Sequence, residues 1–165
     1  MIVRPETPRD GGAIHRVHVA AFGDTDEADL VNALRASEAW IDGLSWVADD
    51  NGLVIAHALI SRVEIDEAPA LSLAPVSVLP ERQRQGHGTA VIRAALDAAR
   101  ATGLPLVVVL GDPAYYRRLG FQPAADYHLS APWPGVADAF QVLLLPSYAG
   151  QPQGKVSYPV PFKEM

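Results

Sequence analysis

Residues 83–89, Gln-Arg-Gln-Gly-His-Gly-Thr, place two closely spaced glycines where an apolar strand-like run meets a run with helical spacing. The N–H groups in the first turn of a helix have no internal partner and lie at the positive end of the helix dipole. Such groups bind phosphate, and glycines at 86 and 88 would let a pyrophosphate approach the backbone. The pattern therefore favours an anion-binding turn, to which Arg82 and Arg84 would add charge.

Two common nucleotide loops do not fit this turn. A P-loop needs four residues between its glycines, followed by Lys-Ser or Lys-Thr. A dinucleotide-binding turn needs a third glycine where Val91 stands. A plain strand-to-helix turn, with glycines serving only the backbone conformation, remains an alternative.

A second motif follows downstream. The turn matches the pattern Q/R-x-x-G-x-G/A, and Tyr116, 28 residues after Gly88, begins the pattern Y-x-x-L-G-F that ends at Phe121. This pair of motifs, in the order strand, turn, helix, strand, short helix, resembles the GNAT superfamily of N-acetyltransferases. The segments Ala56-His57, 110–113 and 154–158 extend the resemblance to a bacterial branch of predicted acetyltransferases over nearly the whole chain.

The resemblance implies that acetyl-CoA is the co-substrate and that its pantetheine arm enters between two splayed central strands. A backbone N–H, that of Val78 or a neighbour, would stabilise the oxyanion. Tyr116 would protonate the leaving thiolate, because a phenol with a pKa near 10 is neutral at physiological pH; core packing is its structural alternative. The residues assigned to the cofactor are Val78, Gln83, Arg84, Gln85, Gly86, His87, Gly88, Thr89, Asp112 and Tyr115.

The general base is less well defined by the sequence. An alkylamine is largely protonated at neutral pH, so a group must accept its proton. Glu27 and His57 are the candidates, because each lies in an element that borders the acceptor cleft of this fold. Glu27 could instead form a helix-capping pair with Asp24, and His57 could be a hydrogen-bonded core residue. Any of the three tryptophans, at 40, 46 and 133, could line the acceptor pocket.

The resemblance implies a single α/β domain spanning residues 1–165, with a mixed, mostly antiparallel central sheet whose central strands splay apart between flanking helices. Strands are expected at 2–6, in a hairpin over 44–65 that turns at Asn51-Gly52, and at 70–78, 104–110 and 140–145. Helices are expected at 9–22, from 24 onward, at 89–101 and at 113–120. Pro75, inside a strand, predicts a bulge or a splay.

Composition narrows the function classes. The chain has 165 residues, a net charge of −6 and no cysteine, which excludes disulfides and thiolate metal sites. The absence of a basic stripe argues against nucleic acid, and no apolar run or leader pattern indicates a membrane span or a signal peptide. No histidine spacing predicts a metal site. A cytoplasmic protein is expected, and a homodimer is compatible with the sequence.

The function expected is acetyl transfer from acetyl-CoA to a primary amine of a small molecule or peptide, in a ternary complex. The alternative is a catalytically silent acyl-CoA-binding sensor of the same fold, which would have no need for a thiolate acid at Tyr116. Coenzyme A release with a panel of amines would distinguish the two.

Overall fold

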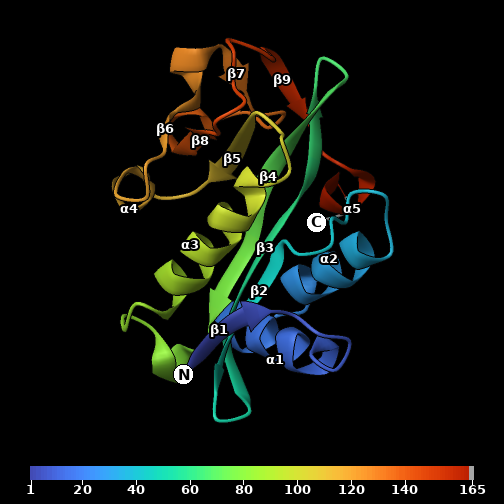
Figure 1. The fold of residues 1–165 in the computed structure, drawn as a ribbon, viewed down its shortest axis with the longest axis vertical. Coiled ribbons are helices and arrows are strands. Elements are labelled where there is room, and N and C mark those ends of the chain that lie inside the picture. Colours follow the sequence, from blue (N-terminus) through green and yellow to red (C-terminus); the bar gives the residue numbers. More distant parts are fainter. Residues whose placement is uncertain (164–165) are drawn as a thin grey trace.

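A nine-stranded mixed sheet forms the centre of the protein (Figure 1). The computed structural model describes residues 1–163. In chain order the strands are β1 (Ile2–Pro5), β2 (Ser45–Asp50), β3 (Leu53–Ile65), β4 (Ala68–Val78), β5 (Leu106–Leu110), β6 (Gln122–Pro123), β7 (Leu129–Ser130), β8 (Phe140–Leu144) and β9 (Gly154–Ser157). The main path is β1-β2-β3-β4-β5-β8-β6, and β9 pairs with β3 and β7. All pairs are antiparallel except β4–β5 and β7–β9, which confirms the expected mixed sheet.

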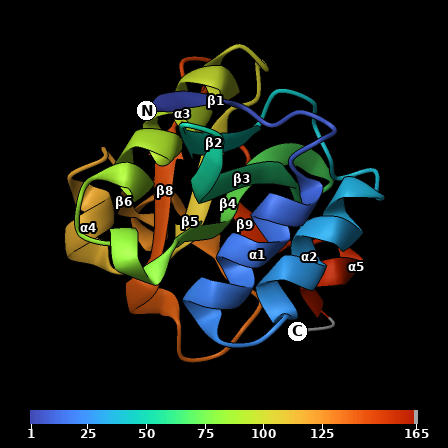
Figure 2. The same ribbon diagram turned by 90° about the horizontal axis from the view of Figure 1, so that it is seen from below.

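Helices cover both faces of this sheet. They are α1 (Gly11–Phe22), α2 (Asp26–Arg35), α3 (His87–Arg100), α4 (Pro113–Arg117) and α5 (Val160–Lys163), with short 3-10 turns η1 (Pro80–Arg82), η2 (Ala124–Tyr127) and η3 (Ala137–Ala139). Helix α1 packs on β3 and β4, and α3 packs on β2 and β3. Figure 2 shows α1 and α2 together on one side of the sheet and α3 on the other. Within residues 1–163, no helix combines the length and the apolar character needed to cross a bilayer.

The two central parallel strands separate after a short stretch of pairing. β4 and β5 are paired only at Leu71–Val107 and Ser72–Val108. Beyond these pairs β4 continues to Val78 with no partner on its β5 side. The sheet is therefore open between the ends of β4 and β5, as the resemblance predicts.

Pro75 lies at an irregularity of β4, as expected for a proline inside a strand. In the β3–β4 ladder Ala58 is opposite Val76, whereas Ile60 is opposite Leu73. Two residues of β4, one of them Pro75, therefore face a single residue of β3, which is the arrangement of a β-bulge. Because proline has no N–H to donate, a bulge is one of the few places where a strand tolerates it.

The start of α2 differs from the expected capping pair. The N-cap residue is Thr25, without a side-chain cap bond, and α2 begins at Asp26. Asp24 still caps locally, because its Oδ1 accepts a hydrogen bond of 3.0 Å from the N–H of Asp26. The side chain of Glu27 also lines the cavity described below.

Candidate functional site

The glycine turn leads directly into α3. Gly86 is the N-cap residue with φ of 85°, a left-handed conformation that glycine adopts without strain. The first helical backbone bond runs from the N–H of Ala90 to the oxygen of Gly86, so the N–H groups of residues 87–89 precede the helical ladder. A Cβ atom at Gly88 would lie 3.3 Å from the side chain of Val78, so glycine keeps the turn close to β4.

A cavity of about 590 Å³ opens beside this turn, and we call it the arginine-lined cavity. It is lined by Val78, Arg82, Gln83, Arg84, Gly86, His87, Gly88, Thr89, Arg93, Tyr115, Arg118 and Leu119. In the part of the chain that the structure describes, its lining includes four arginines and no acidic residue. Guanidinium groups next to a helix N-terminus form a site that suits the negative charge of a pyrophosphate.

Two of these arginines were not predicted from the sequence. Arg93 lies one helical turn after Thr89, and this spacing is a signal that could have identified it. The guanidinium group of Arg118 lies 5.6 Å from the centroid of the Tyr115 ring. The hydroxyl of Tyr115 is 2.7 Å from Oγ1 of Thr89, so α3 and α4 are joined along this cavity.

Two predicted cofactor residues lie outside the arginine-lined cavity. Gln85 is exposed, and its Oε1 is 3.3 Å from Nε2 of His87. Asp112 is the N-cap of α4, where its Oδ1 accepts a hydrogen bond of 3.0 Å from the N–H of Ala114. The geometry thus gives Asp112 a helix-capping role, and its contact with the cofactor stays a prediction.

The amide of Val78 faces the gap between β4 and β5. The N–H of Leu79 donates to the oxygen of Ile55 over 2.9 Å, so the next pair along the ladder, Ala56 and Val78, is of the non-hydrogen-bonded kind. The N–H and C=O of Val78 therefore point away from β3. Consistent with this direction, Nε2 of Gln83 donates to the oxygen of Val78 at 3.1 Å.

Tyr116 lies on α4 at the other side of this gap. Its ring meets the rings of Tyr115 and Phe121 edge-on, at centroid distances of 5.0 and 5.5 Å. A Cβ atom at Gly111 would overlap the Tyr116 ring, so glycine is needed there for the ring to fit. Burial raises the pKa of Tyr116 to about 12, and Tyr115 adds to the shift. The phenol is therefore neutral at physiological pH.

A second cavity, of about 430 Å³, lies on the α1–α2 side of the gap, and we call it the apolar cavity. It is lined by Phe22, Glu27, Leu30, Ser72, Leu73, Ala74, Pro75, Val76, Leu110, Tyr116, Trp133, Tyr158 and Phe162. Val76 and Tyr116 line this cavity, whereas Val78 and Tyr115 line the arginine-lined cavity. The two cavities therefore flank the same opening in the sheet. Of the three tryptophans, Trp133 is the one that the structure brings to the apolar cavity.

Glu27 supplies the acidic group of the apolar cavity. Its Oε2 atom is buried and has no hydrogen-bond partner. Burial raises the pKa of Glu27, and the neighbouring carboxylates Asp24 and Asp26 add to the rise. A carboxyl group in this state can bind an ammonium group or accept a proton.

His57 lies in a different environment, in a chain of hydrogen bonds that we call the histidine chain. Ser77 Oγ is 2.8 Å from Nδ1 of His18, and Nε2 of His18 is 2.7 Å from Nδ1 of His57. Nε2 of His57 is 2.8 Å from Oγ of Ser45, which donates to Glu6. Both histidines are completely buried, and His57 does not line either cavity. In the described part of the chain, no three His, Cys, Asp or Glu side chains are grouped as metal ligands.

A mixed sheet opened between two parallel strands, with a phosphate-binding helix start on one side and a tyrosine at the opening, defines an acetyltransferase of the GNAT type. The family model described as acetyltransferase (GNAT) domain matches residues 42–123. The N-acetyltransferase YhbS of Escherichia coli K12 is 35% identical over 144 residues, covering 86% of this chain and 86% of YhbS. The chain belongs to the GNAT acetyltransferase family.

Solved structures confirm the fold. The crystal structure of Escherichia coli YhbS in complex with CoA has a TM-score of 0.91 and 33% identity, covering 98% of this chain and 91% of that one. A GNAT family acetyltransferase from Brucella melitensis in complex with acetyl-CoA has a TM-score of 0.81 and 36% identity, covering 98% of this chain and 97% of that one. The similarity therefore spans nearly the whole domain.

Proposed function

We propose that this protein transfers an acetyl group from acetyl-CoA directly to a primary amine, with both substrates bound together. The observation that carries the proposal is that the arginine-lined cavity and the apolar cavity flank one opening in the sheet, with Tyr115 lining the first cavity and Tyr116 the second. Family membership supports acetyl-CoA as the co-substrate, and two relatives of similar length are in complex with CoA or acetyl-CoA.

The residues of the arginine-lined cavity fit the donor substrate, which supplies the activated acetyl thioester. The N–H groups of residues 87–89 and the guanidinium groups of Arg84 and Arg93 would hold its pyrophosphate. The N–H of Val78 points into the gap, where it would donate a hydrogen bond to the acetyl oxygen. Holding both substrates in this geometry accounts for much of the rate enhancement that we expect.

The transfer forms a C–N bond and breaks a C–S bond, so the amine loses a proton and the sulfur gains one. Glu27 is the group in the apolar cavity that would accept the amine proton. Tyr116 would donate its phenolic proton to the leaving sulfur. Water restores both groups after each turnover. We assign no contact with the amine to His57, since it is buried away from both cavities.

Replacement of Tyr116 by phenylalanine tests the acid role. Tyr116→Phe should lower kcat by roughly 100-fold, a typical contribution of a positioned proton donor, while the Kd for acetyl-CoA changes less than about twofold. Thiol release and calorimetry measure the two quantities. Tyr127→Phe, at a hydroxyl that donates to Gln122, is the matched control. An unchanged kcat in Tyr116→Phe would contradict the proposed acid.

A valine at Gly86 tests the phosphate site. Gly86 and Gly103 have φ of 85° and 73° and open space around a Cβ atom, so both substitutions carry a similar backbone strain. Gly86→Val should weaken acetyl-CoA binding at least about tenfold, because the helix start moves. Gly103→Val, away from the cavity, should leave binding unchanged. Equal affinities in the two variants would refute this site. Acetyl-CoA binding with no thiol release for any amine would favour a silent acyl-CoA sensor.

A further inference from the structure

Within the described residues, the lining of the apolar cavity contains one acidic side chain and no basic one. Nine of its lining residues are apolar, and the others are Glu27, Ser72, Tyr116 and Tyr158. The arginine-lined cavity has the opposite character, with four arginines. A substrate carboxylate or phosphate would therefore find no counter-ion in the apolar cavity, and burial of an unpaired charge is costly.

Glu27 defines where a single positive charge can bind. Its Oε2 atom is buried without a hydrogen-bond partner, which is unusual for a carboxylate oxygen in a folded protein. An ammonium group supplies up to three N–H donors, so one of them can complete the bonding of this oxygen. Among residues 1–163 no further carboxylate lines the cavity, so a second ammonium group would find no partner among them.

The walls of the apolar cavity expose hydrophobic surface that a ligand could cover. The side chains of Phe22 and Leu110 are 44% and 42% exposed, among the most exposed large apolar residues of the protein. Trp133 packs on Tyr158 at a ring-centroid distance of 4.7 Å, and Tyr158 packs on Phe162 at 5.0 Å. This aromatic wall suits a flat or compact apolar group.

We infer that the acceptor is a compact primary monoamine on an apolar body, such as an arylalkylamine, which carries neither a carboxylate nor a second cation. The amine would bind at Glu27 and the apolar body against Trp133 and the exposed Phe22. A volume of about 430 Å³ lies at the small end of the range for ligand sites, which favours a single-ring or two-ring amine over an oligosaccharide. This inference rests on the proposed acetyl transfer and specifies its second substrate.

Matched pairs of amines test the inference by thiol release with the full-length protein. Phenethylamine and tryptamine should exceed phenylalanine and tryptophan, which add only a carboxylate, by roughly 100-fold in kcat/KM. The kcat/KM values of phenethylamine and tryptamine should also exceed those of spermidine and kanamycin, which carry additional positive charges. A preference for the amino acids, for spermidine or for kanamycin would overturn the acceptor class and leave acetyl transfer intact. No thiol release above the rate without amine, for any of the six, would count against both.

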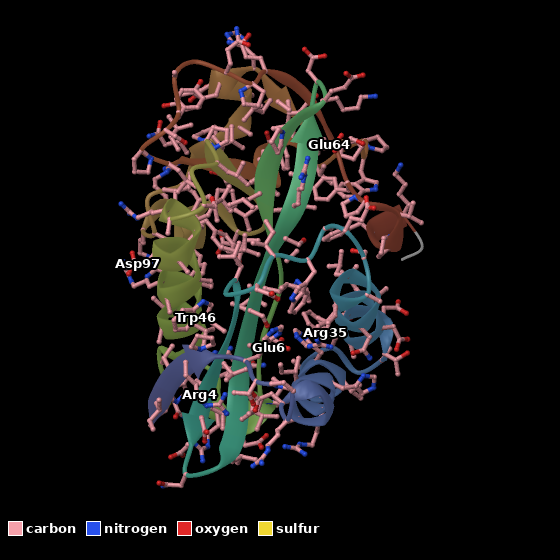
Figure 3. All side chains as sticks on the ribbon, turned by 45° about the vertical axis from the view of Figure 1, so that its right-hand side comes forward. Arg4, Glu6, Arg35, Trp46, Glu64 and Asp97 are labelled. Carbon is pink, nitrogen blue, oxygen red and sulfur yellow. The ribbon has the colours of Figure 1, made fainter. Side chains whose placement is uncertain are left out.

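Substitutions at Trp133 locate the apolar body of the acceptor. Trp133→Ala should raise KM for phenethylamine by roughly tenfold, through the lost apolar contact, with KM for acetyl-CoA changed less than about twofold. Trp133→Phe, which keeps an aromatic wall, should restore most of the affinity. The matched control is Trp46→Ala, since Figure 3 shows Trp46 beside α3, on the face opposite α1 and α2. Equal KM values for phenethylamine in Trp133→Ala and the parent would overturn the assignment.

Discussion

Two half-buried carboxylates on the same side of the sheet differ in how completely their hydrogen bonds are made. Glu6 receives two bonds from Arg35, of 3.0 and 3.2 Å, and a third from the hydroxyl of Ser45. In Figure 3, Glu6 and Arg35 lie close together on the side of α1 and α2. Glu27, in contrast, keeps one buried oxygen without a partner.

The charge on Glu6 sets the direction of every proton in the histidine chain. An ionised carboxylate only accepts, so the hydroxyl of Ser45 donates to it and takes the N–H of His57 on its own oxygen. Nδ1 of His57 must then accept from Nε2 of His18, and Nδ1 of His18 must accept from the hydroxyl of Ser77. Each ring nitrogen of the two neutral histidines therefore has a partner.

The completeness of hydrogen bonding separates polar groups that stabilise the fold from polar groups that are available for binding. The histidine chain joins α1 to β2, β3 and β4. With the hydrogen-bond directions derived above, each ring nitrogen in it has a partner. Glu27, in contrast, has a buried oxygen without a hydrogen-bond partner, and its side chain lines a cavity next to the gap in the sheet. Buried polar groups are normally satisfied, so an unsatisfied one beside a cavity indicates a ligand.

The largest expected effect is on turnover at Glu27. Glu27→Gln keeps the shape of the side chain but removes its ability to accept a proton, so kcat should fall roughly 100-fold or more. The free energy of unfolding, measured in urea, should stay equal or rise, because the buried Oε2 has no hydrogen-bond partner to lose and a poorly solvated charge is removed. Glu38→Gln, at an exposed carboxylate, is the control. Full activity in Glu27→Gln would remove Glu27 from the mechanism.

The opposite pattern is expected at His57. His57→Leu leaves a ring nitrogen of His18 and the hydroxyl of Ser45 buried without their partner, which should lower the free energy of unfolding by about 2–5 kcal/mol. Thiol release per folded molecule should change little. His15→Leu, at a half-buried histidine on α1, is the matched control. A loss of turnover without a loss of stability would instead make His57 catalytic and break the comparison.

The sequence predicts the donor side of the site far better than the acceptor side, for a physical reason. A phosphate-binding turn is local: residues 83–89 carry its glycines and its helix start within seven positions, so the pattern is readable. The bulge at Pro75 and the position of Tyr116 are also local features, and the structure places both at the gap. Strands β6, β7 and β9 were not predicted, because each is too short to produce a clear periodic pattern.

The apolar cavity has no comparable local signal. Its walls come from α1, α2, β4, β5, α4, α5 and the segment around Trp133, which meet only after the sheet has formed. Trp133 could not be distinguished from Trp40 or Trp46 by sequence, since none of the three belongs to a motif. The histidine chain likewise joins positions up to 59 residues apart, so Ser77 and His18 give no pattern.

A smaller effect, on the pH dependence of stability, distinguishes the histidine chain from Glu27 further. Burial lowers the pKa of His18 from 6.5 to about 4, and His15 adds to the shift. The unfolded chain therefore binds a proton at this site before the folded protein does. The stability that the neutral histidine contributes is complete above pH 6.5 and is lost as the pH falls towards 4, by at most ~1.4 kcal/mol per pH unit. Urea titrations at pH 7, 6 and 5 measure this slope.

Glu27 should act with the opposite sign, and the variants separate the two contributions. Burial raises its pKa above the ordinary 4.5, so the stability linked to its protonated form is complete below pH 4.5 and is lost as the pH rises through the folded pKa. Glu27→Gln should therefore gain stability relative to the parent between pH 4.5 and 7. His18→Gln should reduce the loss of stability between pH 6.5 and 4, where Asp10 and Arg35 also act on the histidine chain. If both variants kept the parent slope, neither the histidine chain nor Glu27 would be coupled to folding as described, and the contrast between the two would lose its energetic basis.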